Sequence, residues 1–168
     1  RVLLPGVGAI RDCMAEIKRL GIDQIVADQM GKKPMLGICV GMQALMQRSS
    51  ENGGVDCLAQ LPGDVSFFGD QASVRETHLK VPHMGWNQVK QQPHKLWDAI
   101  EDNSRFYFVH SYYVRTQERD LVAATCNYGL EFDVALAREN LFAVQFHPEK
   151  SQAAGLQLLQ NFLQWDGS

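Results

Sequence analysis

The chain has 168 residues, a length typical of one domain with a full hydrophobic core. Its formal net charge is −3 without a long basic or acidic run, and no apolar run reaches the ~18 residues of a membrane span, so nothing supports nucleic acid or a membrane as a partner. Four cysteines at scattered spacings, with no C-x-x-C pair, argue against a disulfide framework or a zinc ribbon and favour a reducing compartment such as the cytoplasm.

The first part of the chain predicts strands that alternate with helices. A short buried strand at 1–4 is followed by helices at about 10–20 and 22–30 and by a second strand at 35–38. The apolar residues expected on the inner helix faces are Ile10, Met14, Ile17, Ile25 and Val26. Strand, helix and strand in this order imply a parallel sheet.

The remainder of the chain predicts mainly strands. We expect extended segments at 74–81, 86–89, 105–109, 121–126, 132–136 and 141–146, and a short helix at 95–100. An amphipathic helix at 153–165 carries Leu156, Leu159 and Leu163 on one face. Together these elements predict a single α/β domain with a mixed, mostly parallel central sheet.

The segment around Cys39 is the first with chemical content. An apolar strand leads into Cys39, glycines at 37 and 41 flank it, and a helix running to about 48–50 follows. Strand, sharp turn and helix with a nucleophile at the turn are typical of a nucleophile elbow. The helix N-terminus favours a thiolate, and the N–H of Val40 is placed to hold an oxyanion. The other cysteines (Cys13, Cys57 and Cys126) are interpreted as packing residues.

A second motif follows the strand at 141–146. His147 stands at the strand end, Pro148 restricts the backbone after it, and Glu149 can reach the second imidazole nitrogen. Cys39, His147 and Glu149 would then be nucleophile, base and orienting carboxylate. A histidine alone at a strand end is more often a surface residue, so the interpretation depends on the two motifs together.

The turn Pro5-Gly6-Val7-Gly8 ends the first strand. A glycine-rich turn can bring a backbone N–H of Val7 or Gly8 against a developing oxyanion. Phosphate binding and a plain turn are the alternatives, although the turn lacks the Lys and Ser/Thr of a P-loop.

These residues resemble a known family. Gly37-Ile38-Cys39-Val40-Gly41-Met42-Gln43 together with Phe146-His147-Pro148-Glu149 is similar to the class I glutamine amidotransferases. Three further segments resemble one branch, the glutaminase subunits of imidazole glycerol phosphate synthase: Leu4-Pro5-Gly6-Val7-Gly8, Pro82-His83-Met84-Gly85-Trp86-Asn87 and Phe108-Val109-His110-Ser111-Tyr112. The resemblance covers nearly the whole chain and implies a flavodoxin-like, three-layer fold.

The resemblance also implies an activity and a partner. Glutamine would be hydrolysed to glutamate and ammonia, with Gln43 and the backbone at Ser111-Tyr112 holding the substrate's amino-acid end. Ammonia would pass to a (β/α)8-barrel cyclase subunit in a heterodimer of histidine biosynthesis, with Trp86, Asn87 and Lys150 near the interface. No metal or cofactor is expected, because thiolate and oxyanion hole supply the chemistry.

One departure from the family concerns the start of the chain. The family has a strand–helix–strand region before the Pro-Gly-Val-Gly turn, and only its last strand is present here, so we expect residues 1–168 to be one amidotransferase domain that lacks roughly 30 residues of βαβ structure. Three alternatives stay open: a subunit for anthranilate or guanylate synthesis, a γ-glutamyl peptidase with the same elbow, and a non-catalytic binding remnant.

Overall fold

The central sheet is organised around three parallel strands. The structure, a computed structural model, describes residues 1–168. Strand β2 (Met35–Cys39) lies between β1 (Val2–Gly6) and β12 (Leu141–Val144), and both neighbours run parallel to it. All five residues of β2 are buried, which explains why its sequence is a continuous apolar run.

The sheet continues beyond β12 mainly through antiparallel pairs. Its path is β1-β2-β12-β11-β9-β5-β3-β4, with β10 and β7 joined to it beside β11, and parallel pairing returns only between β3 and β5. The further strands are β3 (Arg48–Ser49), β4 (Val55–Asp56), β5 (Asp64–Phe67), β7 (Lys90–Gln91), β9 (Tyr112–Arg115), β10 (Val122–Asn127) and β11 (Glu131–Arg138). A separate two-stranded sheet pairs β6 (His83–Gln88) with β8 (Arg105–His110).

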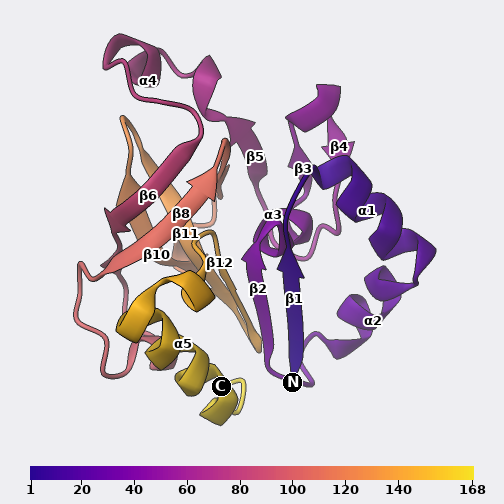
Figure 1. Cartoon of the computed structure of the whole chain (residues 1–168). Helices are drawn as coiled ribbons and strands as arrows, with labels where there is room; N and C mark the ends of the chain where they lie inside the picture. The colour runs from indigo at the N-terminus through magenta and orange to yellow at the C-terminus, as the bar shows by residue number, and fades with distance from the viewer.

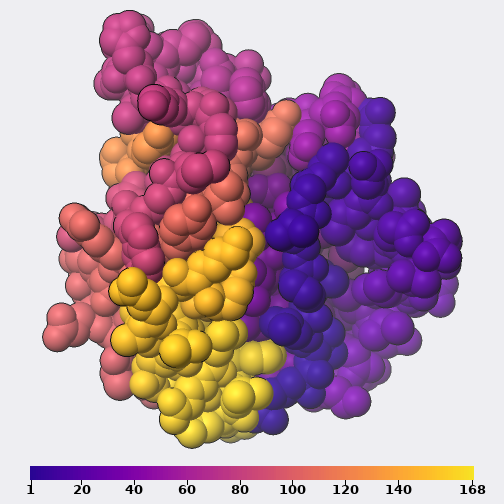
Figure 2. Space-filling view, viewed as in Figure 1, coloured from indigo at the N-terminus to yellow at the C-terminus, as the bar shows by residue number.

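Helices lie on both sides of the parallel strands (Figure 1). The helices are α1 (Ile10–Arg19), α2 (Ile22–Gln29), α3 (Val40–Leu45), α4 (Ala72–Glu76) and α5 (Gln152–Gln164), with 3-10 turns at Glu51–Gly53, Phe68–Asp70, Lys95–Trp97, Arg119–Leu121 and Pro148–Lys150. Figure 2 shows the C-terminal segment, in yellow, against the N-terminal strand, in indigo. The Arg1 guanidinium joins them by donating to the carbonyls of Phe162 and Trp165. No helix has the length and apolar character needed to cross a membrane.

The α/β class and the mixed sheet predicted from the sequence are confirmed. The helices at 10–20 and 22–30 and the strands at 35–38, 105–109, 121–126, 132–136 and 141–146 appear with small shifts of their ends. All four cysteines are free; Cys126 is buried and Cys13 and Cys57 are half-buried.

Three predictions about local structure were wrong. Segment 74–81 is not extended: α4 occupies its start and a turn follows, with Val74 buried on the helix. Ile25 is 52% exposed, and only Val26 of α2 is buried. The helix after the elbow ends at Leu45, and 48–49 form β3, because the carbonyls of 44–47 accept hydrogen bonds from N–H groups of the 57–61 loop instead of continuing the helix.

The inner face of α5 also differs from the prediction. Leu156 and Leu163 are exposed, and the buried residues are Gly155, Leu158 and Phe162. A Cβ on Gly155 would lie 1.9 Å from the Pro148 carbonyl oxygen, so the helix backbone itself approaches the loop after β12 at this point. That close approach turns the glycine side of α5 inward and leaves Leu156 and Leu163 in solvent, with Leu159 half-buried at the edge of the core.

Truncating a leucine side chain on each face of α5 should change the free energy of unfolding by different amounts. Leu158→Ala should lower the free energy of unfolding by about 2–5 kcal/mol, because it empties a filled core site. The matched change Leu156→Ala should stay within about 0.5 kcal/mol, because that side chain is mostly in water. Urea denaturation of both variants measures this difference, and equal losses would show that the inner face is wrongly assigned.

Candidate active site

Cys39 occupies a strained turn between β2 and α3. Its backbone has φ 54° and ψ −113°, a conformation that non-glycine residues rarely adopt. A Cβ on Gly41 would lie 1.8 Å from the Leu4 carbonyl oxygen, and one on Gly37 would lie 2.8 Å from Cδ1 of Leu45. The two glycines therefore let β1 and α3 close on the turn, as a nucleophile elbow requires.

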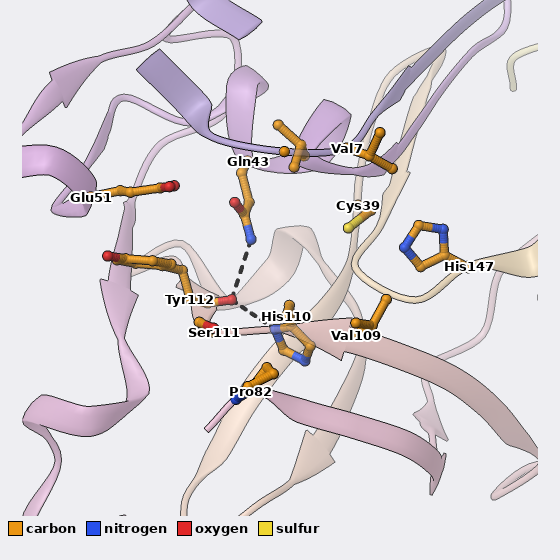
Figure 3. A pocket seen from close by; sticks show the side chains of 12 residues that line it. Val7, Cys39, Gln43, Glu51, Pro82, Val109, His110, Ser111, Tyr112 and His147 are labelled. Atoms are coloured by element: carbon orange, nitrogen blue, oxygen red, sulfur yellow. Dashed lines mark hydrogen bonds between the residues drawn. The ribbon is translucent and has the colours of Figure 1, made fainter. Parts of the chain in front are cut away.

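His147 follows β12, the strand next to β2. Its Nδ1 lies 2.7 Å from Oε1 of Glu149, and the ring is buried while the Glu149 side chain is about half exposed. Since the carboxylate accepts, Nδ1 carries the proton and Nε2 is left free to act as a base. Both His147 and Cys39 line one cavity, and Figure 3 shows the imidazole beside Cys39.

Backbone and hydroxyl contacts fix the loop that carries His147. The His147 N–H donates to the Tyr107 carbonyl at 2.9 Å, and the buried Ser151 hydroxyl donates to the His147 carbonyl at 2.6 Å. The same hydroxyl accepts from the Tyr107 N–H at 2.9 Å. Strand β8 and the residue before α5 thus hold the backbone of His147 through both its N–H and its carbonyl.

A cavity of about 350 Å³ opens over the elbow. The predicted residues that line it are Val7, Gly8, Cys39, Val40, Gln43, Ser111, Tyr112 and His147. They come from four separate parts of the chain, and Figure 3 shows them around one space. The structure thus brings together the residues predicted as nucleophile, base, oxyanion hole and substrate contacts, with Glu149 bonded to His147.

Sequence reasoning missed several residues of this site. The cavity is also lined by Glu51, Pro82, Val109 and His110, and Gln145 lies beneath it. The Gln145 amide donates to Cys39 Sγ at 3.8 Å and accepts from Gln43 Nε2 at 3.0 Å. Gln145 could have been recognised as a site residue, because it is a polar residue inside the apolar run 141–146. Glu51 could not, because it lies in a loop whose position the sequence does not indicate.

Burial dominates the electrostatics of the nucleophile. It raises the pKa of the Cys39 thiol to about 11, and hydrogen bonds from the Val40 backbone and from Gln145 offset only part of that effect. The Val40 N–H contact lowers the pKa and so favours the thiolate, as expected from the sequence, but desolvation outweighs it. With this raised pKa the thiol form dominates at neutral pH, so the predicted role as nucleophile would require a base at the moment of attack.

The expected interface residues lie outside the cavity. Trp86 is 42% exposed with its ring centroid 6.1 Å from that of Tyr107, and Lys150 Nζ lies 6.0 Å from the Tyr107 ring centroid. Asn87 lies next to Trp86 in β6, but its amide bonds inside the chain, to His83 and the Asn127 carbonyl. No group of three or more His, Cys, Asp or Glu side chains is arranged to hold a metal ion.

Comparison with known proteins identifies the family. The family model for class I glutamine amidotransferases matches residues 1–165. The chain belongs to the class I glutamine amidotransferases, and the resemblance based on the motifs around Cys39 and His147 is confirmed.

Curated relatives indicate to which branch of the family the chain is similar. The chain is 60% identical over 168 residues to imidazole glycerol phosphate synthase subunit HisH 1 of Pseudomonas aeruginosa, covering 99% of this chain and 79% of the relative. It is 55% identical to subunit HisH of Acinetobacter baylyi, covering 99% of this chain and 80% of the relative. The fold is similar to a solved glutamine amidotransferase (TM-score 0.67, 17% identity, 96% and 76% of the chains) and to a glutamine amidotransferase of Thermotoga maritima (TM-score 0.62, 17% identity, 97% and 61%).

The raised pKa of Cys39 predicts how its reactivity depends on pH. With a pKa of about 11, the thiolate fraction is small at neutral pH, so alkylation by neutral iodoacetamide should rise about tenfold per pH unit between pH 6 and 9.5. Mass spectrometry of the Cys39 peptide follows the rate, and a Cys39→Ser variant gives the background from the other cysteines. A rate that levels off below pH 8 would show a resting thiolate instead.

Proposed function

We propose that this chain is the glutaminase subunit of an imidazole glycerol phosphate synthase. It hydrolyses glutamine to glutamate and ammonia, and the ammonia passes to the cyclase subunit in histidine biosynthesis. The observation that carries the proposal is the convergence of the strained Cys39 elbow and the His147–Glu149 pair in one cavity. The HisH relatives, at 55–60% identity, support the choice of synthase.

The first half of the reaction forms a thioester. Nε2 of His147 takes the proton of the Cys39 thiol as sulfur attacks the side-chain amide carbon of glutamine. The oxyanion that develops lies against the N–H of Val40 and an N–H of the Val7–Gly8 turn. His147 then gives its proton to the departing amine, and the C–N bond breaks to leave ammonia and a γ-glutamyl thioester on Cys39.

The second half regenerates the thiol. His147, neutral again, takes a proton from water as the water oxygen attacks the thioester carbonyl carbon, and the sulfur leaves with that proton. Glu149 holds Nδ1–H throughout and stabilises the imidazolium that forms twice in each cycle. Products are glutamate and the ammonia already released, so no redox step or further reactant is needed.

The amino-acid end of glutamine is held on the side of the cavity away from His147. Its ammonium group would meet the carboxylate of Glu51 and Oε1 of Gln43, because both are acceptors on the cavity wall. Its carboxylate needs donors. The Ser111 and Tyr112 carbonyls are already bonded within the chain, so the hydroxyl and N–H groups of this segment remain for that contact.

The partner would be a (β/α)8-barrel cyclase, HisF, in a heterodimer. Met84 and Trp86 of β6 are 62% and 42% exposed. The Tyr107 ring lies beside Trp86, and Lys150 Nζ lies over the Tyr107 ring. Trp and Tyr are among the residue types enriched in interface hot spots. Asn87 lies next to Trp86 in the same strand and would also be near the interface. We also propose a cytoplasmic location, where reduced thiols persist.

The glutaminase half of the reaction can be separated from synthesis. Cys39→Ala should lower glutamine-dependent synthesis by the complex by at least about 10³-fold and leave ammonia-dependent synthesis unchanged, because only ammonia release uses the thiol. His147→Ala should match it, and Glu149→Ala should be milder because it only orients the base. Initial rates with glutamine or ammonium salt measure both arms, and equal loss in both would contradict the assignment.

The exposed patch on β6 predicts where the partner docks. Trp86→Ala should weaken binding to the cyclase subunit by at least about tenfold, because truncating a central aromatic residue removes a large buried contact. Leu156→Ala is the matched control, since Leu156 is also exposed but lies on α5. Isothermal titration of each variant against the cyclase compares them, and an unchanged affinity for Trp86→Ala would exclude this face.

A further inference from the structure

A line of hydrogen bonds, which we call the relay, runs from Asn87 in strand β6 through His83 and His110 to the Tyr112 carbonyl at the wall of the cavity. Nδ2 of Asn87 lies 3.2 Å from Nε2 of His83, and Nδ1 of His83 lies 2.9 Å from Nε2 of His110. Nδ1 of His110 then lies 2.7 Å from the Tyr112 carbonyl oxygen. The two histidines are directly paired in the register of β6 and β8, so the sheet itself sets their contact.

The direction of every bond in this line is fixed by chemistry. The Tyr112 carbonyl can only accept, so Nδ1 of His110 carries a hydrogen. A neutral His110 then has an unprotonated Nε2, which must accept from Nδ1–H of His83. Nε2 of His83 is in turn unprotonated and accepts from the Asn87 amide. Both rings are therefore Nδ1–H tautomers, and a proton on either Nε2 would break the line.

The surroundings keep both imidazoles neutral and fixed. His83 and His110 are 3% and 6% exposed, and burial lowers the pKa of His83 to about 4 and that of His110 to about 3. The His83 ring stacks on Tyr128 at 4.1 Å and on Phe108 at 4.8 Å between centroids. At neutral pH each ring has one protonation state and little room to turn.

The line ends on the side chain that meets the substrate. The Tyr112 carbonyl also accepts from Gln43 Nε2 at 3.2 Å, and the same nitrogen donates to Gln145 Oε1 at 3.0 Å. Both hydrogens of the Gln43 amide are thus used on acceptors of the protein. Figure 3 shows the amide nitrogen directed at Tyr112 and the oxygen directed away from it. The amide can only present its oxygen, an acceptor, to the cavity.

We propose that His83 and His110 are positioning residues for glutamine binding, which hold the Tyr112 carbonyl in place and thereby fix the Gln43 amide with its oxygen toward the substrate ammonium group. This inference rests on the proposed glutaminase function and adds two residues that touch neither the reacting sulfur nor the amide carbon. Because the relay acts on substrate binding, its loss changes KM for glutamine more than kcat.

Two substitutions at His83 test the relay in the assembled synthase. His83→Phe keeps an aromatic ring against Phe108 and Tyr128 but removes the donor to His110, and it should raise KM for glutamine by about 5- to 100-fold with kcat changed less than about threefold. His83→Asn carries an amide nitrogen near the position of Nδ1, so it should return KM to within about threefold of the wild type. Ammonia-dependent synthesis should be unchanged in both variants.

The relay is overturned by an unchanged KM in His83→Phe, or by a fall in kcat with KM unchanged. A second measurement does not depend on a substitution: nitrogen-15 spectra of the imidazoles in the wild-type complex at pH 7 should show Nδ1–H tautomers for His83 and His110, and an Nε2–H tautomer at either overturns the relay. A wild-type complex that hydrolyses no glutamine overturns the proposed function, and the role in binding with it, while the tautomers still report on the relay itself.

Discussion

The site depends on the contact between β1 and the turn after β2. Cys39 has a positive φ that costs about 1–3 kcal/mol wherever a side chain is present, so the surrounding structure must impose it. The Leu4 carbonyl occupies the space where a Cβ of Gly41 would be, and β1 and β12 pair with β2 on either side. This arrangement places Cys39 at the end of β2, in the cavity that His147 also lines, but it also buries the thiol and raises its pKa. In the proposed reaction, His147 therefore activates the Cys39 thiol, and no resting thiolate is needed.

The fold was predictable where one physical signal dominated. The short apolar run at 35–38, after Pro34 and before the glycine-flanked Cys39, predicts a buried strand, and it is β2. Sequence patterns gave wrong predictions where tertiary contacts determine which face of an element is buried or which conformation a segment adopts. The leucine stripe of α5 is a regular helical pattern, but the face that packs is set by Gly155, whose lack of a side chain admits the Pro148 carbonyl. Segment 74–81 ends with Leu79 and Val81 at strand spacing and yet begins as a helix, on which Val74 packs against the Gly129 turn.

The candidate site was predictable to the extent that its residues carry local motifs. Cys39, His147 and Glu149 are recognisable because a turn or a strand end accompanies each of them, and the resemblance to amidotransferases added Gln43 and the Ser111–Tyr112 segment. Residues that reach the site through long-range contacts carry no local motif in the sequence. Glu51 reaches the cavity from a loop, and the His83–His110 pair becomes meaningful only through the register of β6 with β8. The sign of the pKa shift at Cys39 was also beyond the sequence, since it depends on how completely the elbow is covered.

The most direct test of the account is covalent trapping of the nucleophile in the assembled synthase. A glutamine analogue with an electrophilic diazoketone in place of the side-chain amide loses nitrogen when a thiol attacks it and leaves a stable thioether. Peptide mass spectrometry should find one adduct, on Cys39, that competes with glutamine and disappears in a Cys39→Ser variant, while Cys13, Cys57 and Cys126 stay unlabelled. Labelling of one of those three cysteines instead, or no adduct in a complex that hydrolyses glutamine, would contradict the role assigned to Cys39.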